Sequence, residues 1–201
     1  MNLDLPQLFA IAAALGWASG LRLYAVLFFT GLAGLLGWVV LPDGLTLLQN
    51  PLLLGASGLM LAVEFFADKI PGLDTLWDAL HTLIRIPAGA ALAAGVFGGD
   101  SSTWATIAAL MGGTLAATAH TAKATTRAAV NTSPEPFSNI GLSLLGDVSV
   151  PALLWLSWQH TGWFFAALAV SVVTALVSIV VLFRFLRALF RRFVPSPPAT
   201  A

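Results

Sequence analysis

The chain contains no cysteine, so it can form neither disulfides nor thiolate metal sites, and it offers no cysteine nucleophile. It is also poor in charge, because Asp, Glu, Lys and Arg make up only 9% of its 201 residues. A soluble domain usually has about 25% charged residues. Too few polar groups are present to cover a surface that faces water, so we expect lipid to cover it.

Several functions are disfavoured by other absences. The formal net charge is zero, so nothing indicates nucleic-acid binding. The sequence has no G-x-S-x-G elbow, no H-E-x-x-H pair and no Walker phosphate loop. The N-terminus lacks the basic region of a signal peptide, so we expect the first apolar segment to be retained.

Apolar residues are abundant, at 58% of the chain, and they fall into about seven segments. A helix that crosses the hydrocarbon needs about 20 residues. We therefore expect an all-α membrane protein, a polytopic helical bundle of about seven spans. A number from six to eight fits the sequence, and some of the helices are expected to be short or broken. The bundle forms a single domain over residues 1–194, followed by a disordered tail at 195–201. The expected spans are 5–19, 22–41, 51–67, 79–98, 103–121, 137–158 and 162–184, with polar inner loops at 67–78 and 122–136.

The basic residues all fall at alternate ends of these spans. They are Arg22, Lys69, Arg85, Lys123, Arg127, Arg184, Arg187, Arg191 and Arg192. The opposite ends carry Asp4, Asp43 and Asp100 and no Lys or Arg. Cytoplasmic loops are enriched in Lys and Arg. The pattern predicts that the N-terminus lies outside and the C-terminus lies in the cytoplasm.

One dense polar cluster precedes and enters the fourth expected span. Its members are Glu64, Asp68, Asp74, Asp78, His81 and Arg85, of which the last four are spaced to share one helix face. Ionisable groups in a membrane usually face the bundle interior and mark substrate or ion pathways. The cluster fits a cytoplasm-facing site for a cation, a proton or a phosphate group, and Glu64, Asp68, Asp78 and His81 are candidate ligands of a hard divalent ion. The alternative is a salt-bridge network with Lys69, Lys123 and Arg127.

Two further stripes join the candidate pathway. His120, Lys123 and Arg127 follow helical spacing at the end of the fifth span. Asn139, Ser143 and Asp147 do the same in the sixth span. An Asp at the centre of a span costs about 2.5–3.5 kcal/mol on insertion scales, so Asp147 needs a partner, protonation or water. His81, Arg85 and His120 are candidate partners.

Several stretches resemble a family of small bacterial membrane proteins, the domain of unknown function 4126. They are residues 18–22, 64–72, 78–82, 87–90 and 139–143, and 64–72 is the most specific. The resemblance implies the bacterial cytoplasmic membrane and a multi-pass architecture, and it supplies no activity. Residues 15–19 and 145–149 also resemble each other, as do 80–82 and 119–121, which leaves an internal pseudo-symmetry open.

The favoured function is secondary transport or conduction of a small solute or ion, with Asp147 as the acid inside the membrane. No cofactor is expected, although the sequence leaves open whether a cation binds. The alternatives are an intramembrane enzyme that acts on a lipid or lipid-linked phosphate, and a non-catalytic assembly or scaffold protein. The expected partners are the lipid bilayer and the small solute or ion, and a homo-oligomer is left open.

Overall fold

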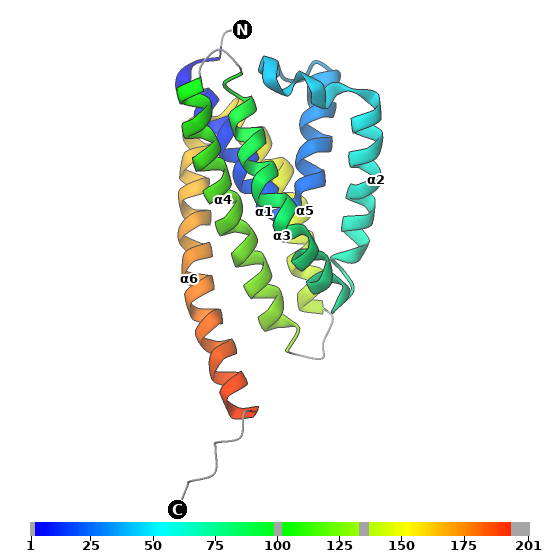
Figure 1. The fold of residues 1–201 in the computed structure, drawn as a ribbon, viewed down its shortest axis with the longest axis vertical. Coiled ribbons are helices and arrows are strands. Elements are labelled where there is room, and N and C mark those ends of the chain that lie inside the picture. The colour runs from blue at the N-terminus through cyan, green and yellow to red at the C-terminus, as the bar shows by residue number, and fades with distance from the viewer. Residues whose placement is uncertain (1–2, 99–101, 133–136, 194–201) are drawn as a thin grey trace, which may run out of the picture.

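The computed structural model describes residues 3–98, 102–132 and 137–193, and these ranges are helical apart from short connections (Figure 1). The elements run in the order α1 (Leu5–Leu35), η1 (Asp43–Gln49), α2 (Pro51–Ala67), α3 (Leu73–Gly95), α4 (Ser102–Val130), α5 (Phe137–Gln159) and α6 (Thr161–Phe193). The expected all-helical bundle is therefore confirmed. The expected tail, 195–201, and the turn at Asp100 lie outside the described residues.

Helix α1 is broken at Arg22, whose φ of −149° and ψ of 87° are not helical. The first half descends from the N-terminus, and the second half runs back towards η1 (Figure 1). The second expected span, 22–41, is too long, because α1 ends at Leu35. Gly37 has a φ of 71°, and its N–H and that of Trp38 bond to the carbonyls of Gly34 and Ala33. This left-handed cap ends the helix, since glycine adopts a positive φ without steric cost.

The polar inner loops were predicted too long. Helix α3 begins at Leu73, after Gly72 with its φ of 86°, and α4 continues to Val130, so much of 67–78 and 122–136 is helical. Asp74 steadies the start of α3 by accepting hydrogen bonds from the backbone N–H groups of Gly72 and Thr75. Asp74 and Asp78 of α3 and Lys123 and Arg127 of α4 therefore lie on helices, where the sequence predicts loops.

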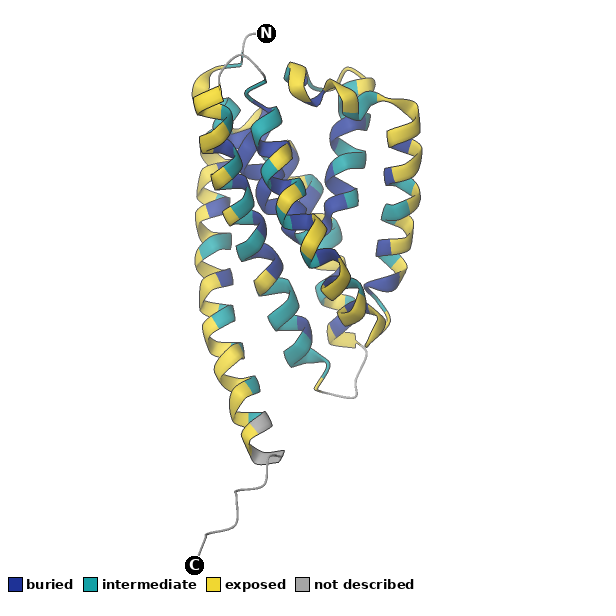
Figure 2. Cartoon of the chain, in the orientation of Figure 1, coloured by how far each residue is buried: buried dark blue, intermediate teal, exposed yellow. Residues whose placement is uncertain are grey.

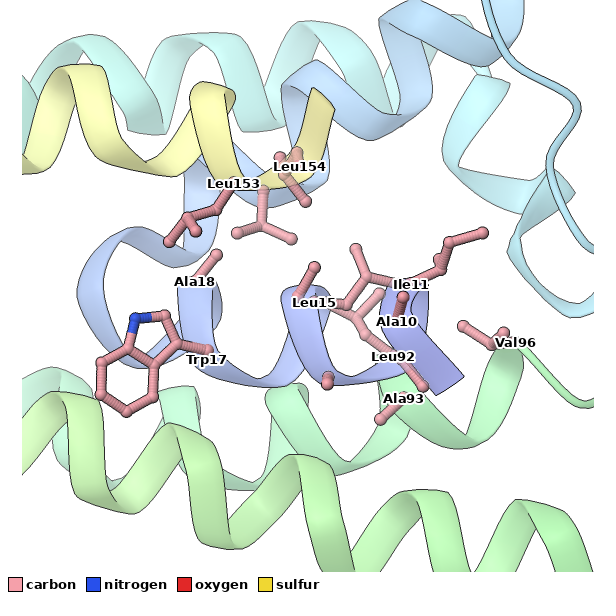
Figure 3. Packing of buried hydrophobic residues seen from close by; sticks show 14 of the residues in the cluster. Ala10, Ile11, Leu15, Trp17, Ala18, Leu92, Ala93, Val96, Leu153 and Leu154 are labelled. Atoms are coloured by element: carbon pink, nitrogen blue, oxygen red, sulfur yellow. The ribbon is translucent and has the colours of Figure 1, made fainter. Parts of the chain in front are cut away.

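The first half of α1 is the centre of the fold, and α3, α4 and α5 pack around it (Figures 2 and 3). It is rich in alanine, and every residue from Ala10 to Gly20 is buried. Gly16 and Gly20 allow α4 to come close. A Cβ at Gly20 would lie 2.2 Å from the carbonyl oxygen of Ala116, and one at Gly16 would lie 2.5 Å from Gly112 Cα. Small residues at such crossings are typical of membrane bundles.

The outward faces of the helices are exposed (Figure 2), and many of the side chains exposed there are large and apolar. In the described part of the chain, three helical stretches are long and apolar enough to cross a membrane: Leu5–Leu35, Phe137–Gln159 and Thr161–Leu189. The pair η1 and α2, bent by 71°, qualifies as one broken span. Large side chains such as Leu83 and Trp163 are 82% and 75% exposed. These apolar helices indicate a membrane protein.

Candidate functional site

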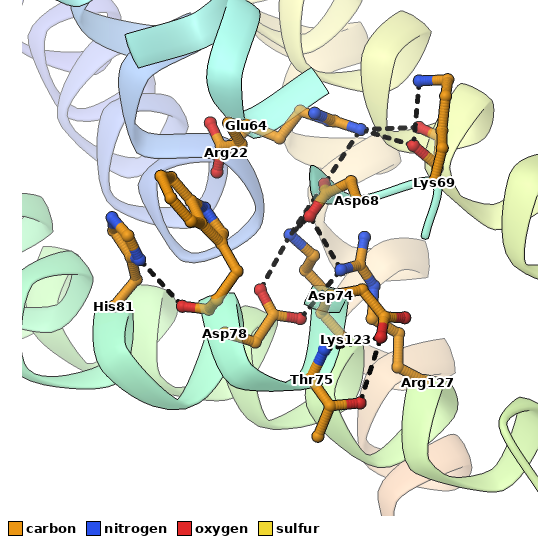
Figure 4. A network of polar contacts seen from close by, with 12 residues as sticks. Arg22, Glu64, Asp68, Lys69, Asp74, Thr75, Asp78, His81, Lys123 and Arg127 are labelled. Carbon is orange, nitrogen blue, oxygen red and sulfur yellow. Dashed lines mark hydrogen bonds and ion pairs between the residues drawn. The ribbon is translucent and has the colours of Figure 1, made fainter. Parts of the chain in front are cut away.

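Arg22 occupies the break in α1 and is only 1% exposed. Its Nη2 lies 3.0 Å from Asp68 Oδ2 and 3.0 Å from Asp147 Oδ1. The same atom donates to the Ser143 hydroxyl at 2.9 Å and to the Ser143 carbonyl at 3.1 Å. One guanidinium therefore joins the break in α1 to the end of α2 and to the middle of α5 (Figure 4).

Asp68 caps the C-terminal end of α2 and is fully buried. It receives Arg127 Nη1 at 2.7 Å on Oδ1, and Lys123 Nζ at 3.2 Å and Arg22 Nη2 at 3.0 Å on Oδ2. Burial alone would disfavour the carboxylate. The attraction of Lys123, Arg127 and Arg22 outweighs that effect and holds the pKa of Asp68 well below its usual range. Asp68 is thus a carboxylate fixed by three cations.

Asp78, on α3, shares two of those cations. It lies 3.1 Å from Lys123 Nζ and 3.3 Å from Arg127 Nη1 (Figure 4). It also accepts Arg85 Nη1 at 2.7 Å, and Arg85 Nη2 reaches Glu64 Oε1 at 2.6 Å. The side chains of Arg85 and Glu64 are both fully buried. The structure therefore links Asp68, Asp78 and Glu64 through cations from α3 and α4.

Asp147 is the carboxylate on the α5 side, and its side chain keeps 19% exposure. Its partners are Arg22 and Lys69, whose Nζ lies 3.1 Å from Oδ2. Lys69 also donates to Ser143 Oγ at 3.2 Å and lies 3.1 Å above the centre of the Phe65 ring. The candidate partners expected from sequence were wrong, because the α5 stripe faces the break in α1 and the end of α2. We call the cluster defined by these ion pairs the charge network: Arg22, Glu64, Asp68, Lys69, Asp78, Arg85, Lys123, Arg127 and Asp147.

The two candidate histidines, His81 and His120, have different surroundings. His81 Nδ1 contacts the Trp77 carbonyl at 2.8 Å, and its Nε2 lies 3.1 Å from the Tyr24 hydroxyl. His120 contacts the Thr82 hydroxyl at 2.7 Å and Arg85 Nη1 at 3.4 Å. His120 therefore touches the charge network, whereas His81 pairs with aromatic side chains beside it.

The candidate metal ligands do not converge. Glu64, Asp68 and Asp78 each face Arg or Lys, and His81 faces Tyr24. Within the residues that the structure describes, no group of three or more His, Cys, Asp or Glu side chains is arranged to hold a metal ion. What the cluster holds together is carboxylates and cations, as the salt-bridge alternative anticipates.

Two members of the charge network, Arg22 and Lys69, are not among the candidate site residues from sequence, whereas Asp74 and Asn139 belong to the predicted polar stripes. Arg22 and Lys69 were treated only as topology markers or counter-charges, although a lone Arg between two apolar segments is itself a signal of a buried charge. Asp74 is fully buried and accepts from Asn131 Nδ2 at 3.1 Å. Asn139 is 1% exposed, and its amide finds no hydrogen-bond partner within the described ranges.

A cavity of about 400 Å³ lies beside the charge network, between α1, α4, α5 and α6. Its charged lining residues are Arg22, Asp68, Lys123 and Arg127. Ser143 and Ser149 of α5 and several hydroxyls of α6 add polar groups, and the remaining wall is apolar. The volume falls within the roughly 300–1,000 Å³ typical of small-molecule sites.

Comparison with known proteins identifies the family of the chain. No curated protein and no solved structure matches the chain. A family model described as a domain of unknown function, DUF4126, matches residues 9–181, which is most of the chain and includes every member of the charge network. The protein therefore belongs to the DUF4126 family.

Proposed function

We propose that this protein is a secondary transporter of a small solute or ion, whose pathway passes the break in α1. The observation that carries the proposal is the position of Arg22. A buried arginine in a broken apolar helix contacts carboxylates from two other elements and lines a cavity. Secondary transporters place substrate sites at discontinuous helices in this way.

The ion pairs give Arg22 and Asp147 a second partner of opposite charge each. Arg22 contacts both Asp68 and Asp147, and Asp147 contacts both Arg22 and Lys69. The Arg22–Asp147 pair can open while each group keeps one opposite charge. Such an exchange avoids the large cost of an unpaired buried charge. We propose that α5 moves relative to α1 in this step, with Asp147, the more exposed carboxylate, changing partners.

The proposal includes the topology expected from sequence. The two halves of α1 count as separate crossings, and with α2 to α6 they make seven spans. The N-terminus is outside and the C-terminus is in the bacterial cytoplasm, and support comes from the one-sided Lys and Arg residues. The similar stretches at 15–19 and 145–149 belong to α1 and α5, the helices that carry Arg22 and Asp147. This relation supports an internal pseudo-symmetry.

Flux through reconstituted vesicles tests the proposal. Purified protein in proteoliposomes is exposed to a panel of inorganic ions and small carboxylates, with uptake measured under proton and sodium gradients. We expect gradient-dependent uptake of at least one panel member, loss of it in Asp147→Asn, and normal uptake in Asp43→Asn. Asp43 is an exposed aspartate in η1, so it is a matched control. Uptake by Asp147→Asn equal to wild type would contradict the role of Asp147.

A further inference from the structure

Helix α6 extends past its neighbour α4 at its C-terminal end (Figure 1). Residues 161–183, which form the first part of α6, contain no Asp, Glu, Lys or Arg. At a rise of about 1.5 Å per residue they cover about 34 Å, close to the roughly 30 Å of the hydrocarbon core of a bilayer. The last turns of α6 therefore emerge from the hydrocarbon at the level of the lipid headgroups.

These last turns carry three arginines on one face. Arg184, Arg187 and Arg191, which we call the arginine stripe, follow the spacing of three and four residues that aligns side chains along a helix. All three are exposed. Leu182 and Leu186 lie on the opposite face and are half-buried. The arginine stripe therefore points away from the rest of the bundle.

The arginine stripe has no acidic partner in the part of the chain that the structure describes. Every other Lys and Arg whose side chain is described belongs to the charge network and contacts Asp or Glu. Helix α6 itself contains no Asp or Glu. The positive charge of the stripe is therefore left for anionic groups outside the chain.

The position and chemistry of the stripe fit the headgroups of anionic phospholipids. Its members are all arginines, whose planar guanidinium matches a phosphate group with two parallel hydrogen bonds. Basic residues next to a membrane-crossing helix attract anionic lipids. Val180 lies one turn before Arg184 on the same face and is 50% exposed, so the stripe continues into apolar surface that an acyl chain can cover.

We propose that the arginine stripe binds anionic phospholipid, with lipid phosphates on the three guanidinium groups and an acyl chain along Val180. Continuity with an exposed apolar face favours a lipid, which has both an anionic and an apolar part, over an acidic segment of another protein. The inference goes beyond the proposed transport and does not depend on it.

Quenching of a fluorophore beside the stripe tests the proposal. Val180→Cys supplies a unique thiol, since the chain has no cysteine, and it is labelled with bimane. The protein is placed in phosphatidylcholine nanodiscs that contain a small, equal fraction of either phosphatidylglycerol or phosphatidylcholine spin-labelled on the acyl chain near the headgroup. The spin label quenches nearby bimane, so the ratio of the two signals measures the local enrichment of the anionic lipid.

We expect phosphatidylglycerol to be enriched about fivefold or more at position 180, as for one arginine at a membrane surface, and the enrichment to fall at high salt. Equal quenching by the two lipids overturns the proposal and leaves the stripe to an acidic segment of another protein.

Two comparisons assign the enrichment to the stripe. R184Q/R187Q/R191Q changes only exposed side chains, so it should keep the wild-type unfolding temperature and lose the enrichment, whereas R184K/R187K/R191K keeps the charge and should keep part of it. Leu80→Cys, at a 61% exposed position of α3, is the matched labelling site and should show no preference. Wild-type enrichment in the glutamine variant, or equal enrichment at position 80, overturns the proposal.

Discussion

Arg22 Nη2 lies 3.0 Å from Asp147 Oδ1, and this ion pair fastens the break of α1 to the middle of α5. The Arg22 side chain is 2% exposed and that of Asp147 is 19% exposed. A charged pair so far from water is weak evidence for stability, because desolvation offsets much of its attraction. The pair matters for its location, because it joins α1 and α5, and both helices line the same cavity.

Breaking this pair from one side should destabilise the protein strongly. Arg22→Gln leaves Asp147 with Lys69 alone and removes one of the three cations on Asp68. Removal of one partner of a buried pair costs about 3–5 kcal/mol. We expect a lower thermal unfolding temperature in detergent, and we expect Arg22→Gln/Asp147→Asn to recover part of the loss. A double variant no more stable than Arg22→Gln would show that the pair is not coupled.

Close packing of α1 on α4 predicts a contrast between two glycines. Gly20→Ala would put a Cβ 2.2 Å from a backbone oxygen, so the helices must separate. Overpacking of this kind costs about 1–3 kcal/mol. Gly55, inside α2, has open space around its would-be Cβ, so Gly55→Ala should stabilise by up to about 1 kcal/mol. Thermal unfolding of both variants checks the contrast, and equal effects would contradict the crossing.

The lowered pKa of Asp68 predicts that the folded protein loses stability in acid. Its pKa is lowered in the folded state, so its contribution is fully present above the unfolded pKa of about 3.9 and is lost as pH falls through the folded value. We expect the unfolding temperature of wild type to fall as the pH drops below about 4. Asp68→Asn should be less stable at neutral pH and should lose part of this acid dependence. Asp43→Asn, at an exposed position, should keep the wild-type profile.

The topology can be read with reporter fusions. A reporter fused after Ala201 should report the cytoplasm, and one inserted at Asp43 or Asp100 should report the periplasm. The basis is that the basic residues occur at alternate ends of the apolar segments. An external C-terminus would contradict the seven-span arrangement.

Sequence reasoning found the helices because their apolar runs are long. The span at 51–67 agrees with α2 to the residue, and 137–158 with α5 to within one residue. It failed at the inner ends of α3 and α4, where helices continue through polar sequence. The polar sequence there predicts loops, yet Asp74, Asp78, Lys123 and Arg127 are helical and buried or half-buried in ion pairs and hydrogen bonds. Hydropathy cannot reveal that such charges neutralise one another.

Sequence reasoning predicted most of the residues that belong to the site, but it did not predict which of them pair with each other. Helical spacing grouped Asn139, Ser143 and Asp147, and two of these meet Arg22. Which cation faces which acid depends on the helix crossings, and these follow from glycines that meet across the bundle. Only the folded arrangement shows that α5 turns its polar stripe to the break in α1 and not to His81 or His120.

Access to Ser143 tests the central claim most directly. Ser143 is 1% exposed, contacts Arg22 and lines the cavity. Since the chain has no cysteine, Ser143→Cys introduces a unique thiol. Ser157→Cys, fully buried and outside the cavity, is the control. A transport pathway predicts that a membrane-impermeant thiol reagent labels Cys at position 143 from either side of the membrane and leaves the control unlabelled. Labelling from one side only, or from neither, would contradict a pathway through the break in α1.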